Sequence, residues 1–141
     1  MDKKFYEELQ DELKNNILPY WENHAKDSAT EGFFGAIDND NKCDSNEWRG
    51  IVMVSRFLWS YSAAARLYHT IDYLEMADYA YEYMFHHFFD TLNGGMYWAV
   101  KADGDPLDTR KQIYGEAFSI YAICEYAAAQ PFPHALAKGH H

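Results

Sequence analysis

The chain has 141 residues, of which 48% are hydrophobic and 24% charged, so it has the size of one domain and enough apolar residues for a core. Its net charge of −10 argues against nucleic acid and anionic membranes as partners, because both bind basic surfaces. There is no apolar run of about 20 residues that would span a membrane, and the charged N-terminus lacks the apolar centre of a signal peptide, so we expect a cytoplasmic protein.

Helical periodicity predicts the first two elements. Over residues 3–26, apolar residues recur every four positions along one stripe, which is typical of an amphipathic helix. Pro19 should kink or shorten this helix, because proline has no N–H to donate to residue 15. Residues 46–69 are apolar nearly all round, and a helix of that kind is buried on most of its sides.

Two more helices are predicted over residues 72–89 and 110–129, each from apolar residues at helical spacing and from capping residues. The segments between the helices contain Asp, Asn and Gly residues that are typical of turns. The residues that predict the helix ends are Asp72 and Glu75 for the third helix, and Thr109, Gln112 and Pro131 for the fourth.

The chain also contains an internal repeat of about 60 residues. The segment 31–38 resembles the segment 94–101 at an offset of 63, and each follows a helix and precedes a polar turn and a second helix. The repeated unit is therefore a helix, a short extended element, a turn and another helix. We expect the extended elements near Phe33–Gly35 and Met96–Trp98. Repeats of this kind bury their faces on neighbouring units.

We therefore predict one all-α domain over residues 1–138, built from helical hairpin repeats that form two antiparallel pairs. A plain four-helix bundle is the alternative. Connections of roughly 20 residues are long for a bundle, where about 2–8 residues are usual. The C-terminal Gly139–His141 resembles the remnant of a purification tag.

Arg56 is the most informative polar residue, because it lies in the middle of the most apolar predicted helix. An unpaired charge buried there would be costly. One interpretation is a buried ion pair with Glu116, which the repeat offset places one helical turn from Arg56 on the equivalent helix. The other is an inward-facing donor for the oxygen atoms of a substrate. The chemistry of the residue alone favours neither.

Tyr114 and Glu116 open the fourth predicted helix. Tyr114 is either a core residue or a site residue, and the core is the commoner place for a tyrosine in a chain so rich in them. Trp59 and Trp98 are candidate platforms for sugar rings, although tryptophan is more often buried in a core.

The histidines and cysteines predict no metal site. His86 and His87 are adjacent on a helix and point to different faces, which argues against a shared metal ion. Cys43 and Cys124 have no metal-type spacing, and we expect free thiols. The histidines that form no convincing site are His24, His69, His86, His87 and His134.

Four stretches together carry a resemblance to a known family. In chain order they are Glu31–Gly35, Ser55–Ser62, Gly94–Trp98 and Gly104–Phe118. Their order and spacing resemble the N-acylglucosamine 2-epimerase superfamily, and most closely its cellobiose 2-epimerase branch. The resemblance extends from about residue 5 to about residue 130.

The resemblance implies an (α/α)6 barrel, of which this chain would form the N-terminal third, and epimerisation of a reducing-end sugar at C2. One histidine would remove the C2 proton after ring opening and a second would return a proton on the other face. Arg56 and Tyr114 match an arginine and a tyrosine that hold sugar oxygens and stabilise developing charge. No metal or organic cofactor is implied. No histidine of this chain matches the catalytic histidines of the family, and Glu116 stands where relatives often carry glutamine.

Two functions follow from this pattern. The chain is part of a sugar 2-epimerase, inactive by itself, or it is a non-catalytic helical-repeat module that binds sugar weakly or assembles with itself. We assign no catalytic residue. We also expect self-association, with a trimer as one form, because the terminal helices would leave apolar faces uncovered. The predicted substrate-binding residues are Arg56, Tyr114, Glu116, Trp59 and Trp98.

Overall fold

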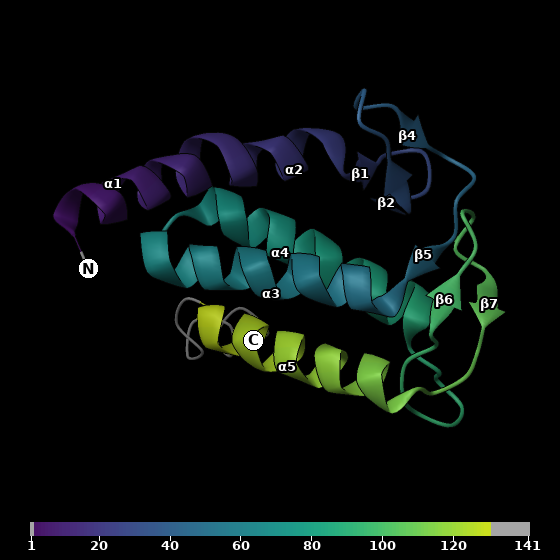
Figure 1. Ribbon diagram of the computed structural model, residues 1–141. Coiled ribbons are helices and arrows are strands. Elements are labelled where there is room, and N and C mark those ends of the chain that lie inside the picture. Colours follow the sequence, from purple (N-terminus) through teal and green to yellow (C-terminus); the bar gives the residue numbers. More distant parts are fainter. Residues whose placement is uncertain (1, 131–141) are drawn as a thin grey trace.

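The computed structural model describes residues 2–130. Its helical segments run side by side (Figure 1). The predicted tag residues and Pro131 lie outside the described residues. The helical elements are α1 (Lys3–Glu12), η1 (Leu13–Ile17) and α2 (Leu18–His24), which form one continuous segment, then α3 (Ile51–Tyr68), α4 (Ile71–Tyr83) with its continuation η2 (Met84–Phe88), and α5 (Ile113–Ala129).

Pro19 does not end the first helical segment, because the turn before it widens. Residues 13–17 form a π-helical turn, and the N–H of Leu18 donates to the carbonyl oxygen of Leu13, five residues back. Pro19 follows directly, in the first turn of α2, so the widened turn accommodates a residue that has no N–H to donate back along the helix. The segment ends at His24 rather than at residue 26, since Lys26 begins a strand.

Two predicted helix starts and both predicted caps were wrong. The second helix begins at Ile51 rather than residue 46, because Arg49 and Gly50 pair with a strand far along the chain. The third helix begins at Ile71, with Thr70 instead of Asp72 at its N-cap position. The fourth begins at Ile113 rather than residue 110, and its N-cap residue, Gln112, makes no side-chain capping bond.

Short strands make the fold predominantly helical rather than purely α. Each strand has only two or three residues, and the pairs are antiparallel. The extended elements predicted near Phe33–Gly35 and Met96–Trp98 lie at or beside strands β2, β3 and β6. The strands are β1 (Lys26–Asp27), β2 (Gly32–Phe33), β3 (Ala36–Ile37), β4 (Cys43–Asp44), β5 (Arg49–Gly50), β6 (Ala99–Val100) and β7 (Pro106–Asp108).

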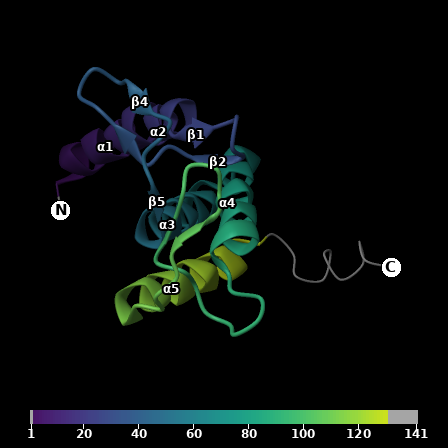
Figure 2. The ribbon, with the colours of Figure 1, turned by 90° about the vertical axis from the view of Figure 1, so that its right-hand side faces the viewer.

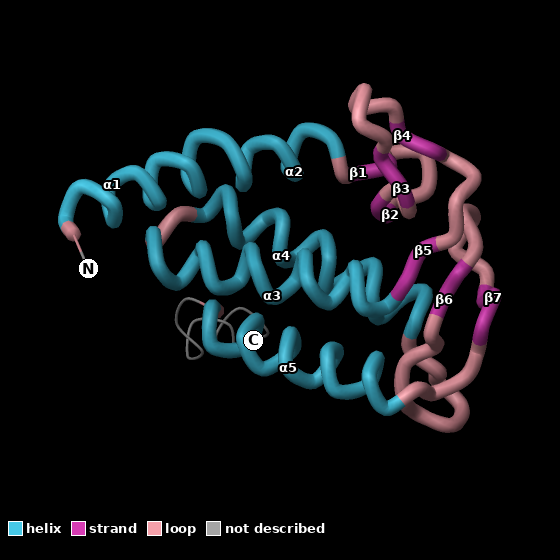
Figure 3. Tube along the Cα trace, in the orientation of Figure 1, coloured by secondary structure: helices cyan, strands magenta, loops and turns pink. Residues whose placement is uncertain are grey.

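The helices form the two antiparallel pairs that the repeat predicts. Figures 1 and 2 show α3 in the centre, with the α1–α2 segment and α5 on opposite sides of it. Helices α3 and α5 start at the strand-bearing end and run parallel, whereas the first segment and α4 run toward that end (Figure 3). The core lies where α3 packs on α4 and α5. Its fully buried side chains include Leu58, Tyr61, Ala77, Met84 and Phe88.

Each of the two repeats contains an ion pair at the equivalent position. Asp27 and Asp90 stand 63 residues apart, and each accepts a hydrogen bond from the backbone N–H two residues later. The other carboxylate oxygen of each aspartate lies 2.8 Å from a cation, Arg49 for Asp27 and Lys111 for Asp90. Each cation lies two residues before its helix, α3 or α5. The pair therefore ties the end of one helix of the repeat to the start of the next.

We expect the Asp90 pair to make stability sensitive to acid. The ammonium group of Lys111, and after it the N–H of Asn93, lower the pKa of Asp90 well below its usual range. A carboxyl whose pKa is lowered in the folded state stabilises the protein at pH values above its unfolded-state pKa of about 3.9. This stabilisation is lost progressively as the pH falls below that value toward the folded-state pKa. The fall in unfolding free energy below about pH 4 should be smaller in Asp90→Asn and in Lys111→Met than in the wild type, as urea titrations at several pH values would show. An unchanged acid dependence in both variants would contradict this role.

Candidate functional site

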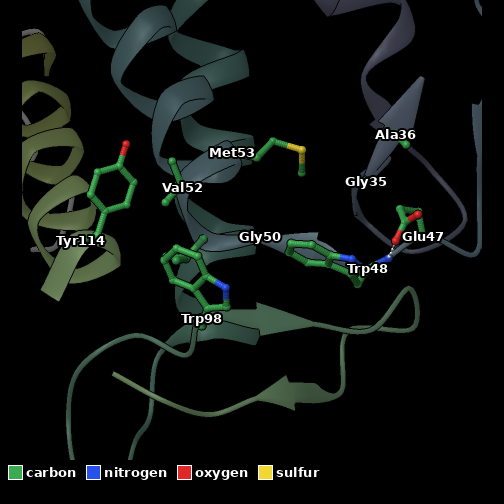
Figure 4. A pocket seen from close by; sticks show the side chains of 10 residues that line it. Gly35, Ala36, Glu47, Trp48, Gly50, Val52, Met53, Trp98 and Tyr114 are labelled. Atoms are coloured by element: carbon green, nitrogen blue, oxygen red, sulfur yellow. Dashed lines mark hydrogen bonds between the residues drawn. The ribbon is translucent and has the colours of Figure 1, made fainter. Parts of the chain in front are cut away.

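A cavity of about 530 Å³ opens where α3 and α5 begin, beside the short strands. Figure 4 shows Val52 and Met53 reaching toward it from α3, Tyr114 from α5, and the indoles of Trp48 and Trp98 from the strand-bearing segments. Aromatic and aliphatic side chains thus form most of its wall. The lining residues are Gly35, Ala36, Glu47, Trp48, Gly50, Ile51, Val52, Met53, Trp98 and Tyr114.

Close backbone contacts hold Trp98 in the wall of this cavity. Its carbonyl oxygen accepts a hydrogen bond from the first N–H of α3, that of Ile51, at 3.0 Å. Gly115 leaves room for the ring, since a Cβ at this position would lie 3.2 Å from the Trp98 indole and 2.9 Å from the Ile51 side chain. The indole of Trp98 is therefore fixed relative to the starts of both helices.

Arg56 lies on the same side of the α3–α5 pair as Tyr114. Its guanidinium carbon is 5.4 Å from the centre of the Phe118 ring, and the Phe118 ring centre is 4.9 Å from that of Tyr114. One helical turn further along α3, Trp59 stacks on Tyr121 at 5.4 Å. Aromatic contacts therefore connect the predicted site residues of the two helices.

A second cavity, of about 740 Å³, adjoins the first along α3. Arg56 and Trp59 line it, and Met53, Gly35 and Ala36 line both cavities. Arg56 is exposed rather than buried, so the buried ion pair, which was one of the two interpretations of its charge, is wrong. Its guanidinium is free to meet a ligand in this space, although binding there stays a prediction.

Glu116 does not join the other predicted site residues. Its Oε1 accepts a hydrogen bond from the backbone N–H of Met96 at 2.7 Å and lies close to Gly95. It lines neither of the two cavities. The proposed ion pair between Arg56 and Glu116 was therefore wrong, and the carboxylate instead holds the segment that leads into β6.

Trp48 and Arg49 are the residues that the sequence analysis missed. The indole of Trp48 is 47% exposed and lines the first cavity, whereas Arg49 next to it is fully buried. Arg49 donates to the carbonyl oxygens of Phe33 and Glu47 and to the carboxylate of Asp27. A half-exposed tryptophan on such a firmly held backbone is well suited to contact a ligand.

Comparison with known proteins identifies the family. The family model described as N-acylglucosamine 2-epimerase (GlcNAc 2-epimerase) matches residues 32–138. The chain belongs to the N-acylglucosamine 2-epimerase family. It is 41% identical to the cellobiose 2-epimerase of Bacteroides fragilis over 96% of its own length and 35% of that protein's length.

Two solved structures of cellobiose 2-epimerases share the fold of this chain. The structure of cellobiose 2-epimerase from Bacillus thermoamylovorans matches with a TM-score of 0.86 and 35% identity over 90% of this chain and 32% of that one. The cellobiose 2-epimerase from Spirochaeta thermophila matches with the same TM-score and identity over 96% and 33%. The chain thus spans about a third of the length of the relatives it matches, and it corresponds to their N-terminal portion.

No histidine of the described residues lines either large cavity of this epimerase-family chain. His24 stacks on Tyr20, and Nδ1 of His87 lies 3.3 Å from the carbonyl oxygen of Gly104.

Between residues 2 and 130, no three His, Cys, Asp or Glu side chains are placed to hold a metal ion. Cys43 and Cys124 are free thiols, as predicted. Over the same residues, no helix is long and apolar enough to cross a membrane.

Proposed function

We propose that this chain is the N-terminal part of a sugar 2-epimerase of the cellobiose 2-epimerase type and that it supplies substrate-binding residues without a catalytic base. The observation that carries the proposal is the 41% identity to a cellobiose 2-epimerase over nearly the whole chain. The cavity supports it, since its volume of about 530 Å³ suits a small molecule.

The chemistry of the lining residues fits a sugar. The indoles of Trp48 and Trp98 and the ring of Tyr114 offer flat apolar faces for the C–H groups of a sugar ring. Arg56 and Tyr114 would donate hydrogen bonds to sugar oxygens, and Arg56 would stabilise the negative charge that develops on oxygen when the C2 proton leaves. The base that takes this proton would come from the later two thirds of the family's chain, which correspond to positions beyond residue 141.

We expect the 141-residue chain to be inactive in C2 exchange. Epimerisation through proton removal at C2 must incorporate deuterium there in heavy water, and general base catalysis needs a titratable group within reach of that proton. Incubation with cellobiose or mannose in heavy water should give no more C2 deuterium by NMR than a protein-free control. Exchange above the control would require a base in this chain and would show that the proposed division of labour is wrong.

We expect Arg56→Ala to weaken cellobiose binding to the chain at least about tenfold, because hydrogen bonds to a charged group contribute about 1.5–3 kcal/mol. Titration calorimetry or NMR would measure the loss, and circular dichroism should show nearly unchanged helicity. Arg66→Ala is the matched control, since Arg66 is an exposed arginine of the same helix that pairs with Glu125 and lines neither cavity. Equal weakening in both variants, or loss of folding in Arg56→Ala, would contradict the assignment.

A non-catalytic module that binds sugar or assembles with itself is the second candidate function. The observation in its favour is that the cavities of the described residues contain no histidine. The heavy-water experiment does not separate the two candidates. A second experiment adds the remaining two thirds of a relative to this chain as a separate polypeptide. Sugar binding without any gain of epimerase activity in that mixture would favour the module.

A further inference from the structure

The stretch of chain that leads to Trp98 has one backbone group that its own pairing leaves free. Met96 lies opposite Phe89 in an antiparallel bridge, and the two hydrogen bonds of this bridge are donated by the neighbouring residues Asp90 and Tyr97. In a pair of this kind the two facing residues exchange no hydrogen bond, so the N–H of Met96 points away from Phe89. Met96 is only 5% exposed, and its N–H therefore needs an acceptor inside the protein.

Glu116 supplies this acceptor from helix α5. Its Oε1 lies 2.7 Å from the backbone nitrogen of Met96. The carboxylate belongs to the first turn of α5, where the partial positive charge of the helix N-terminus stabilises a negative group. A hydrogen bond to a carboxylate is stronger than one to a neutral oxygen, so this contact ties the backbone of Met96 firmly to the start of α5.

Three consecutive residues at the start of α5 have different parts in the wall of the first cavity. Tyr114 lines the cavity with its ring. Gly115 leaves room for the Trp98 indole, which a Cβ there would approach to 3.2 Å. Glu116 holds the backbone two residues before Trp98. In Figure 4 the Trp98 indole stands between Tyr114 and Trp48, and it keeps this place only as long as the backbone that carries it stays close to α5.

The internal repeat separates this contact from the framework that both repeats share. The backbone pairing occurs in both, since the pair of Lys26 with Phe33 lies 63 residues before the pair of Phe89 with Met96. At the same offset, the first repeat has Met53 in place of the glutamate and Gly35 in place of the tryptophan. The first repeat thus pairs its backbone without either side chain. The carboxylate and the indole occur together in the second repeat, as expected if the carboxylate serves the indole.

We propose that Glu116 is a positioning residue of the sugar cavity. It acts through the backbone of Met96 and holds the Trp98 indole where a sugar ring can stack on it. This role rests on the proposed function, because it assumes that the cavity binds a sugar. It gives Glu116 a part in sugar binding although its side chain lines neither cavity. Glutamine can take the same part, since its side-chain oxygen is also an acceptor, whereas alanine cannot.

NMR of the tryptophan indole N–H groups in the sugar-free chain is the first test. Glu116→Ala should shift the Trp98 signal more than the signals of the other three tryptophans, because the lost acceptor holds the backbone that leads to Trp98. Glu116→Gln should leave the Trp98 signal near its wild-type position. Glu125→Ala is the matched control and should also leave it there, since Glu125 is the other glutamate of α5 and pairs with Arg66 on α3.

Titration calorimetry with cellobiose is the second test. Glu116→Ala should weaken binding about three- to tenfold, which is the size of one aromatic contact. Glu116→Gln and Glu125→Ala should bind cellobiose as the wild type does. A purely structural role of Glu116 would lower the urea concentration at which the protein unfolds without changing the affinity of the folded protein, and that result would contradict the positioning role.

An unshifted Trp98 signal in Glu116→Ala, or equal shifts in Glu116→Ala and Glu116→Gln, would overturn the proposal. If Glu116→Ala does not fold, amide hydrogen exchange of the wild type decides. The N–H of Met96 should then exchange at least about tenfold more slowly than in an unstructured peptide, and exchange at the peptide rate would overturn the proposal. A wild type that binds no cellobiose would refute the proposed function, whereas the Trp98 signal, measured without sugar, would still decide whether Glu116 positions the indole.

Discussion

Replacing Arg49 with methionine is expected to cost about 3–5 kcal/mol of unfolding free energy, the range found when one partner of a buried ion pair is removed. Arg49 is fully buried, and its Nη2 lies 2.8 Å from the carboxylate of Asp27, which is itself 4% exposed. Its Nε donates to the carbonyl oxygen of Phe33 at 2.7 Å. Methionine would fill part of the volume but leave the Asp27 carboxylate and the Phe33 carbonyl without this partner.

Urea unfolding of Arg49→Met and of a control variant would measure this cost. Arg110→Met is the control, because Arg110 also pairs with an aspartate, Asp108, but lies at the surface with 73% of its side chain exposed. Exposed pairs contribute little, so the control should unfold at nearly the wild-type urea concentration. Adding Asp27→Asn to Arg49→Met should recover part of the loss, since it removes the unpaired charge. Similar losses in Arg49→Met and Arg110→Met would contradict the structural role of the buried pair.

The positions of the helices could be predicted from the sequence because each helix has a local pattern. Apolar spacing in the first segment and in α4 gave ends within about two residues of the observed ones. The start of α3 could not be predicted in this way. Arg49 and Gly50 belong to β5, whose partner strand β6 lies about 50 residues further along the chain, and a two-residue strand has no local periodicity.

The candidate site was predictable where residues project from a helix and not where they depend on a distant partner. The spacing of Arg56 and Trp59 places them on one side of α3, and the repeat indicated that α5 would lie beside it. The sequence could not show that this side of an apolar helix faces an open cavity rather than protein, so a buried ion pair and a ligand-facing donor were both open for Arg56. The contact of Glu116 could not be predicted because its partner is the backbone N–H of Met96, and a backbone partner leaves no signal in the side chains.

Replacing Gly35 with alanine is expected to damage both the fold and the first cavity. A Cβ at position 35 would overlap the backbone carbonyl oxygen of Trp48 and would lie 3.1 Å from that of Glu47. A backbone carbonyl cannot rotate away as a side chain can, and the neighbouring Glu47 carbonyl is held by Arg49, so the segment that carries Trp48 must move. Overpacking of this kind costs about 1–3 kcal/mol or more. The displacement should also withdraw the Trp48 indole from the cavity wall and weaken sugar binding.

Gly50→Ala is the matched control, because Gly50 lines the same cavity but a Cβ there would meet only the Trp48 ring, at 3.2 Å. That ring is half exposed and can shift by a few tenths of an ångström, so the loss of stability should be limited to about 1 kcal/mol, the difference between glycine and alanine at the N-cap of α3. Urea unfolding would give the two free energies, and NMR of the indole N–H groups of the four tryptophans would show whether Trp48 has moved. In Gly35→Ala the Trp48 signal should shift more than those of Trp21 and Trp59, because a Cβ at position 35 meets the backbone of Trp48 and neither of the other two tryptophans. If Gly35→Ala kept wild-type stability and an unshifted Trp48 signal, the close approach of residue 35 to the Trp48 backbone would not be what fixes this tryptophan at the cavity.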